Sequence, residues 1–153
     1  MSATSGSENS VTIRQLDHSD QQVIDQMFPL LQQLTTTVQP ESIAMALDHS
    51  GTMVFVATKQ STLVGTGSLC WTACLTGVRV HIEDIVIDRA HRNQGIATRL
   101  LTALVDAAQH QLHAKSIDLT SRPDRVAANA LYQKLGFVPR DTNVYRYQPT
   151  SPQ

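Results

Sequence analysis

The amino-acid sequence predicts a mixed α/β fold, with a central sheet flanked by helices, in a single domain. Segments with the two-residue alternation of strands are interleaved with segments whose apolar residues recur at helical spacing. The 153 residues are enough to bury one sound core, and no repeat or linker divides the sequence. We therefore expect one domain over residues 11–148, built as helices packed on a sheet.

The first half of the chain carries signals for two helices and four strands. Residues 11–16 alternate in polarity, and residues 17–20 offer several N-cap side chains for a helix that continues to about Leu34. Pro40 suits the first turn of a second, short helix. That helix should end near Gly51, followed by strands at residues 52–59 and 63–72, a turn at 60–62, a loop at 73–77 and a central strand at 78–87.

The second half carries signals for two helices and three short strands. Residues 94–113 have an apolar stripe at helical spacing. Residues 126–135 form the next helix, which Gly136 ends in a glycine cap, with Phe137 placed for the apolar contact that accompanies such caps. The three short strands are expected at residues 116–120, 137–139 and 144–147.

Charge and terminal composition exclude several classes of protein. The net charge of -1 argues against nucleic acid as the main partner, and no apolar stretch is long enough to span a bilayer. Residues 1–10 are rich in Ser, Thr and Gly and lack the apolar core of a signal peptide, so we interpret them as a disordered leader, and residues 149–153 as a disordered tail. This pattern favours a cytoplasmic protein that binds neither nucleic acid nor membrane, and it leaves a homodimer open.

The cysteines and the paired histidines give no metal site. Cys70 and Cys74 are too few for a disulfide framework, so reduced thiols are expected, and no matching Cys or His pair completes a zinc site. His110 and His113 lie three apart near a helix end without an evident third ligand. We expect them to be a solvated pair favoured by the helix dipole.

The polar turn after the central strand has the features of an anion-binding loop. Residues 85–87 are apolar, Arg92 and Gly95 follow, and the next helix begins at once. A helix N-terminus presents unpaired N–H groups and the positive end of its dipole, and a glycine there lets the ligand approach the backbone. The loop lacks the lysine of a P-loop and two of the three glycines of a dinucleotide fingerprint. An ordinary strand-to-helix turn remains the alternative.

The central strand changes its buried face along its length. Val80 and Ile82 have even parity, whereas Ile85 and Ile87 have odd parity, so the apolar face switches between them. One extra residue, a β-bulge near Asp84, would restore the register. A strand that is buried on both faces would give the same pattern.

Two polar side chains on the central strand are candidates for a general base. His81 and Glu83 share a face, about 7 Å apart, where either could take a proton from an ammonium group. Glu83 is the preferred base, with His81 or a water molecule as alternatives, and Asp84 is expected to point the other way and to be structural. The competing interpretation pairs Glu83 with Arg79 or His81 in a structural contact.

The helix near the C-terminus carries Asn129 and Tyr132, three residues apart and therefore on one face. A phenol there can give a proton to a leaving group, and an amide can form hydrogen bonds with a ligand. The alternative is a tyrosine that packs at the domain edge with its hydroxyl in water.

Together these segments resemble the GNAT superfamily of acyl-CoA-dependent N-acetyltransferases. The Arg92-x-x-Gly95-x-Ala97 pattern resembles its pyrophosphate loop, and the run from Asn129 through Tyr132 to Gly136-Phe137 resembles its second hallmark. The resemblance covers essentially the whole ordered chain. It implies the GNAT fold, in which a bulge splays the central strand from its parallel neighbour and admits the pantetheine arm.

The resemblance also implies the chemistry and the residues of the site. The expected reaction is direct transfer of an acetyl group from acetyl-CoA to a primary amine, without a metal. A small-molecule amine is expected, because the members that acetylate small-molecule amines carry an acidic residue in this strand. Glu83 is then the base and Tyr132 the acid. The residues expected to bind the coenzyme are Ile85, Val86, Ile87, Arg92, Asn93, Gln94, Gly95, Ile96, Ala97, Thr98 and Asn129.

Other functions and residues stay open at this point. A protein or peptide N-acetyltransferase and a non-catalytic acyl-CoA sensor would share the loop, and the tyrosine favours an enzyme. Arg122 and Arg125 either bind an anionic group or are a solvated pair. Trp71 either lines the acceptor pocket or is buried in the core.

Overall fold

The computed structural model describes residues 10–150, which fall into two compact units. The first unit extends to Thr120 and contains the sheet and the helices α1 to α3, and the second begins at Ser121 and contains helix α4. Most of the predicted leader and the last residues of the predicted tail lie outside the described residues.

The first unit is built on the mixed sheet that the sequence predicted. Its strands lie in the order β1-β2-β3-β4-β5, antiparallel from β1 to β4 and parallel between β4 and β5. The strands are β1 (Thr12–Gln15), β2 (Thr52–Lys59), β3 (Thr62–Cys74), β4 (Gly77–Ile87) and β5 (Ser116–Asp118).

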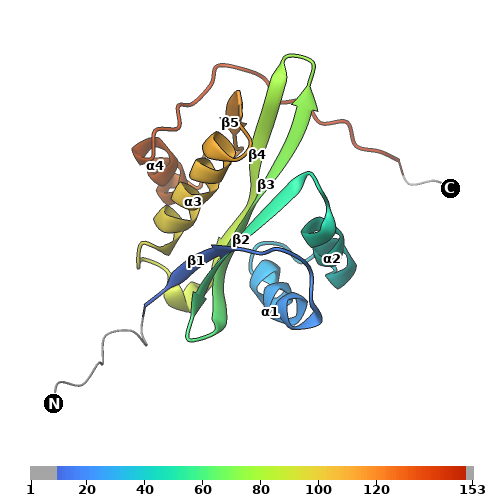
Figure 1. Cartoon of the computed structure of the whole chain (residues 1–153). Coiled ribbons are helices and arrows are strands. Elements are labelled where there is room, and N and C mark those ends of the chain that lie inside the picture. The colour runs from blue at the N-terminus through green and yellow to red at the C-terminus, as the bar shows by residue number, and fades with distance from the viewer. Residues whose placement is uncertain (1–9, 151–153) are drawn as a thin grey trace. The chain divides into compact units, whose positions relative to one another are not determined.

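Helices cover both faces of this sheet (Figure 1). Helices α1 (Gln21–Gln32) and α2 (Pro40–Asp48) lie together on one face, and α3 (Ile96–His110) lies on the other. The Asp20 carboxylate caps α1 by accepting from the Val23 N–H at 2.8 Å, and Pro40 begins α2, both as the sequence indicated.

Each face has its own apolar core. Helix α3 buries Leu100, Leu101 and Leu104 completely against the sheet. On the opposite face, α1 and α2 bury Met27 and Ile43 with residues of β2 and β3. The two apolar helix stripes therefore fix both layers on the sheet that positions the site.

The ends of some elements differ from the prediction. Helix α3 is shorter than residues 94–113 because Gly95 and His113 both have left-handed backbone angles, with φ of 74° and 49°. The predicted loop at residues 73–77 is largely paired, since β3 continues to Cys74, opposite Gly77. A two-residue turn at Leu75 and Thr76, followed by Gly77 with φ 121°, makes this continuation possible.

The second unit consists of α4 (Val126–Lys134) and irregular chain. Its helix ends in the predicted glycine cap, because Gly136 has φ 96°, its N–H donates to Gln133 O, and the Phe137 N–H donates to Tyr132 O. The predicted strands at residues 137–139 and 144–147 are wrong. The cap uses the Phe137 N–H, Pro139 has no N–H, and no backbone partner pairs with residues 138–150 within the described chain.

In residues 10–150, none of the helices is both long enough and apolar enough to span a membrane.

Candidate active site

The predicted β-bulge is present in β4. Thr66 of β3 pairs with Val86 and Ser68 pairs with Glu83, so two residues of β4, Asp84 and Ile85, lie opposite the single residue Gly67. Asp84 has a left-handed φ of 54°, which a carboxylate residue tolerates better than most side chains. The bulge places the Ile85 side chain beside Gly67, Leu100 and Leu104, on the face of the sheet that α3 covers.

Two glycines of β3 make room for this bulge, and sequence reasoning missed them. A Cβ at Gly67 would collide with Ile85 Cδ1, and a Cβ at Gly65 would lie 2.7 Å from Ile87 Cδ1. Two glycines at alternate positions of a strand otherwise rich in apolar and β-branched residues were the available signal. They allow Ile85 and Ile87 to cross the face of β3 and pack beneath α3.

The parallel pair β4–β5 ends before the bulge. Its last registered pair is His81 with Asp118, and β4 continues alone from Ile82 to Ile87 on that edge. Within the first unit the edge therefore offers strand backbone at Ile85, Val86 and Ile87 to a ligand lying alongside it. This arrangement is the splayed parallel pair that the sequence predicted.

The loop after β4 leads into a helix N-terminus that nothing in the described chain caps. Gly95 has φ 74° and makes no side-chain cap, and the first helical bond is Arg99 N–H to Gly95 O at 3.2 Å. The N–H groups of Ile96, Ala97 and Thr98 have no hydrogen-bond partner in residues 10–150. Free N–H groups at the positive end of a 15-residue helix are donors of the kind to which phosphate groups bind in proteins.

Two left-handed residues, Asn93 at φ 60° and Gly95, shape this loop. Nothing lies within 4 Å of the position of a Cβ at Gly95, so the space beside its backbone is open. Arg92, Asn93, Gln94 and Gly95 are all exposed. A loop in which left-handed residues are separated by another residue can present its backbone N–H groups on a concave surface, as anion-binding loops do.

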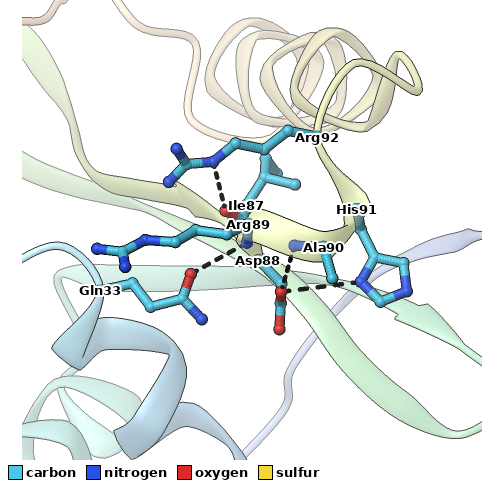
Figure 2. A network of polar contacts seen from close by, with 7 residues as sticks. All are labelled: Gln33, Ile87, Asp88, Arg89, Ala90, His91 and Arg92. Atoms are coloured by element: carbon cyan, nitrogen blue, oxygen red, sulfur yellow. Dashed lines mark hydrogen bonds and ion pairs between the residues drawn. The ribbon is translucent and has the colours of Figure 1, made fainter.

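Polar contacts hold the start of this loop on the rest of the first unit (Figure 2). The Arg92 Nε donates to Ile87 O at 3.2 Å, which leaves its terminal nitrogens available. Asp88 accepts from the Ala90 N–H at 2.8 Å, and the His91 ring lies 4.0 Å from the same oxygen. Gln33, which caps the C-terminus of α1, accepts from the Arg89 N–H at 3.1 Å. Sequence patterns gave no sign of this last contact.

The base candidates lie on the face of the sheet that α1 and α2 cover. Glu83 pairs with Ser68, and paired residues of antiparallel strands point to the same face. Asp84 lines a pocket on this side of the sheet, and its direction relative to Glu83 stays a prediction, because the left-handed backbone at Asp84 interrupts the strand alternation. Neither carboxylate forms a hydrogen bond or ion pair in residues 10–150, and Arg79 instead donates to the Thr76 hydroxyl.

A pocket of about 180 Å³ opens beside Asp84, between the helices α1 and α2 and the sheet. Its walls are mainly apolar, with hydroxyl groups and one carboxylate, that of Asp84. Trp71 and His81 are not among its lining residues. Trp71 is half-buried and does not line this pocket. The lining residues are Met27, Leu31, Leu34, Thr35, Thr37, Val38, Ser42, Ile43, Ala46, Leu47, Val54, Thr66, Gly67, Ser68 and Asp84.

Cys70 is a thiol whose pKa the two carboxylates affect. Partial burial, and then the negative charges of Glu83 and Asp84, raise the pKa of the Cys70 thiol above its ordinary value. A thiol with a raised pKa is protonated at neutral pH and is a poor nucleophile. In the described chain both cysteines are free.

Asn129 and Tyr132 belong to the second unit. Tyr132 is buried, and its ring meets that of Phe137 edge to face, with centroids 6.1 Å apart. The Asn129 amide nitrogen donates to Arg122 O at 2.9 Å and so holds the loop before α4, which leaves its carbonyl oxygen free for a ligand. Arg122 and Arg125 are exposed, and Arg122 lies 3.7 Å from Asp124.

No group of three or more His, Cys, Asp or Glu side chains in residues 10–150 is arranged to hold a metal ion.

Comparison with known proteins gives the family. A sequence profile of the acetyltransferase (GNAT) family matches residues 15–137. The N-alpha-acetyltransferase 30 of Schizosaccharomyces pombe is 33% identical over 108 residues, which are 71% of this chain and 64% of that protein. This chain thus matches less than two thirds of the length of that relative.

Solved structures share the fold. An aminoglycoside acetyltransferase, meta-AAC0020 from an uncultured soil metagenomic sample, in complex with sisomicin, has a TM-score of 0.79 at 17% identity, over 92% of this chain and 97% of that one. Aminoglycoside N-acetyltransferase AAC(6')-Iy in complex with CoA has a TM-score of 0.76 at 16% identity, over 93% and 97%. The profile match and the sequence relative show that this chain belongs to the GNAT family of acetyltransferases.

Proposed function

We propose that this protein transfers the acetyl group of acetyl-CoA to a primary amine by direct attack. The observation that carries the proposal is the uncapped N-terminus of α3, where three free N–H groups follow directly on the open edge of β4. The helix end suits a pyrophosphate, and the strand edge suits the amide groups of a pantetheine arm. Acetyl-CoA carries both groups.

The residues proposed to bind the coenzyme are those of this edge and loop. Ile85, Val86 and Ile87 supply strand backbone, and residues 92–98 supply N–H groups and the Arg92 guanidinium. Asn129 of the second unit is proposed to hold the pantetheine through its free carbonyl oxygen.

The chemistry follows from a nucleophilic amine and a thioester. Glu83 takes a proton from the ammonium, and the free amine attacks the thioester carbonyl carbon. Strand N–H groups near residues 85–87 stabilise the oxyanion of the tetrahedral intermediate. The carbon–sulfur bond then breaks, Tyr132 gives a proton to the leaving thiolate, and the nitrogen of the new amide loses its second proton to solvent, from which Tyr132 is reprotonated. The raised pKa of the Cys70 thiol supports direct transfer rather than an acetyl-cysteine intermediate.

The acceptor is proposed to be a small molecule in the cytoplasm. The pocket beside Asp84 is small, and two free cysteines suit a reducing compartment. The second candidate is acetylation of a peptide α-amino group, which the 33% identity to an N-alpha-acetyltransferase favours.

Release of free CoA thiol from acetyl-CoA tests this proposal. The assay uses a panel of small amines, aminosugars, polyamines, amino acids and peptides, with mass spectrometry of the products. Thiol release that depends on an amine, with an acetylated amine as product, is expected. Absence of both binding and thiol release would contradict the proposal.

A further inference from the structure

We propose that the acceptor is a compact amine with one positive charge and an apolar body, and that Asp84 binds its ammonium group. This inference rests on the proposed function, since it assigns the acceptor of the same site. It is carried by the size of the pocket, the character of its walls and the position of the single carboxylate that lines it.

The volume of the pocket limits the size of its occupant. At about 180 Å³ it is smaller than the roughly 300–1,000 Å³ that drug-sized ligands require. It is close to the engineered apolar cavity of about 150 Å³ that binds benzene. A body of about six carbon atoms therefore fits, and a sugar-based amine with several rings does not.

The walls favour an apolar body over further charges. The apolar lining comes from both helices, with Leu31 and Leu34 from α1 and its C-terminal end, and Ile43 and Leu47 from α2. No Lys, Arg or His lines the pocket. A second ammonium group inside it would lie unpaired against apolar side chains, which is unfavourable.

Asp84 is placed to bind the single ammonium. Asp84 lines the pocket and is exposed to solvent, and within residues 10–150 no hydrogen bond or ion pair engages its carboxylate. The hydroxyl groups of Thr66 and Ser68 are already directed to Phe55 O and Glu83 O. Asp84 is therefore the charged residue of the pocket with which an ammonium can pair, and Glu83, its neighbour in sequence, remains the proposed base.

A homologous series of amines tests the size and polarity of the site. The kcat/KM for acetylation is measured with propylamine, butylamine, hexylamine, decylamine and phenethylamine, and with spermidine, sisomicin and a peptide that begins Met-Leu. We expect kcat/KM to rise about fourfold for each added methylene up to about six carbons and then to fall. Spermidine, sisomicin and the peptide should be poorer substrates than hexylamine.

Two variants assign the effect to this pocket. Asp84→Asn keeps a residue type that tolerates the left-handed backbone, and it should raise KM for hexylamine about tenfold or more with little change in CoA affinity. Ala46→Leu narrows the pocket and should move the optimum to a shorter amine. Met45→Leu, on an exposed position of the same helix, is the matched control and should leave the series unchanged. Melting temperature and CoA affinity verify that each variant is folded.

The outcomes separate the two proposals. If the protein does not bind CoA at all, the proposed function fails and this inference fails with it. If CoA binds, a rate independent of amine length, a preference for spermidine, sisomicin or the peptide, or an unchanged KM in Asp84→Asn would each overturn the inference alone. If CoA binds and no amine of the series is acetylated, the inference is likewise overturned.

Discussion

Gly67 of β3 lies opposite the bulge of β4, and the Ile85 side chain fills the space that a Cβ at Gly67 would occupy. The same Cβ would lie 3.1 Å from Leu104 Cδ1 of α3. The absence of a Cβ at Gly67 thus makes room for the bulge of β4 and for the packing of α3 on the sheet.

Gly67→Ala should destabilise the protein by about 1–3 kcal/mol, because the added methyl overpacks a filled site. It should also weaken CoA binding, since Ile85 must move together with the strand edge. Denaturant unfolding and calorimetry measure the two effects. Thr72→Ala, at an exposed position of the same strand, is the control. A stable Gly67→Ala protein with normal CoA affinity would show that the packing at the bulge is not required.

Glu83→Gln should make Cys70 more reactive. Burial is the main cause that raises the pKa of the Cys70 thiol, and the charge of Glu83 adds to it. Removing that charge lowers the pKa toward its ordinary value, so more thiolate is present between about pH 7 and 9. Alkylation by iodoacetamide, with Cys74 as the internal reference, measures the change. An identical Cys70 rate in both proteins would place Glu83 too far away to act on the thiol.

Glu83→Gln should also lower acetylation most at low pH. An acceptor amine is largely protonated there and needs a base, whereas near its own pKa, about 10 for an alkyl ammonium, it is deprotonated without help. The rate loss should therefore shrink as pH rises, as a pH profile of kcat/KM would show. A loss that is equal at every pH would assign Glu83 to substrate orientation and move the base to His81 or to a water molecule.

Tyr132→Phe should keep CoA affinity and lower turnover by roughly 10²–10⁴-fold, because it removes only a hydroxyl that gives a proton to the thiolate. The Tyr132 hydroxyl makes no hydrogen bond in residues 10–150, and the edge-to-face contact with Phe137 is retained by phenylalanine. Folding should therefore be nearly unchanged. Steady-state kinetics measure the turnover, and calorimetry measures the CoA affinity. Normal turnover in Tyr132→Phe would contradict the role of Tyr132 as general acid and leave it a packing role only.

The sequence predicted the elements whose signal is local. Periodicity located the helices and the strands β1 to β5, the capping residues Asp20 and Gly136 marked helix ends, and the change of parity in β4 indicated the bulge. These features depend on residues close together in the chain, which a pattern can show.

Features that depend on tertiary packing were missed or wrong. Strict alternation does not extend through Asp84, because the bulge and its left-handed backbone interrupt it, and the pattern does not say where the interruption turns the side chain. Short segments near the C-terminus, around residues 137–139 and 144–147, had strand-like composition but no backbone partner. The Gln33–Arg89 contact joins residues that are 56 positions apart, and the pocket is lined by segments from Met27 to Asp84. No local sequence pattern could reveal contacts over such separations.

Binding of acetyl-CoA to the N-terminus of α3 is the central claim, and Gly95→Val is its matched test. The substitution places a branched side chain in the open space where a pyrophosphate would meet the backbone. Gly136→Val, at a second glycine with positive φ and open space around it, has a similar backbone strain of about 1–2 kcal/mol and is the control for folding.

Calorimetric titration of acetyl-CoA into the three proteins is the most direct measurement. We predict that the wild type and Gly136→Val bind, with a stabilisation of roughly 2.7 kcal/mol at about 100 times the dissociation constant. Gly95→Val should bind about tenfold or more weakly while remaining folded. No binding by the folded wild type at millimolar acetyl-CoA, or equal affinity in Gly95→Val, would contradict the claim.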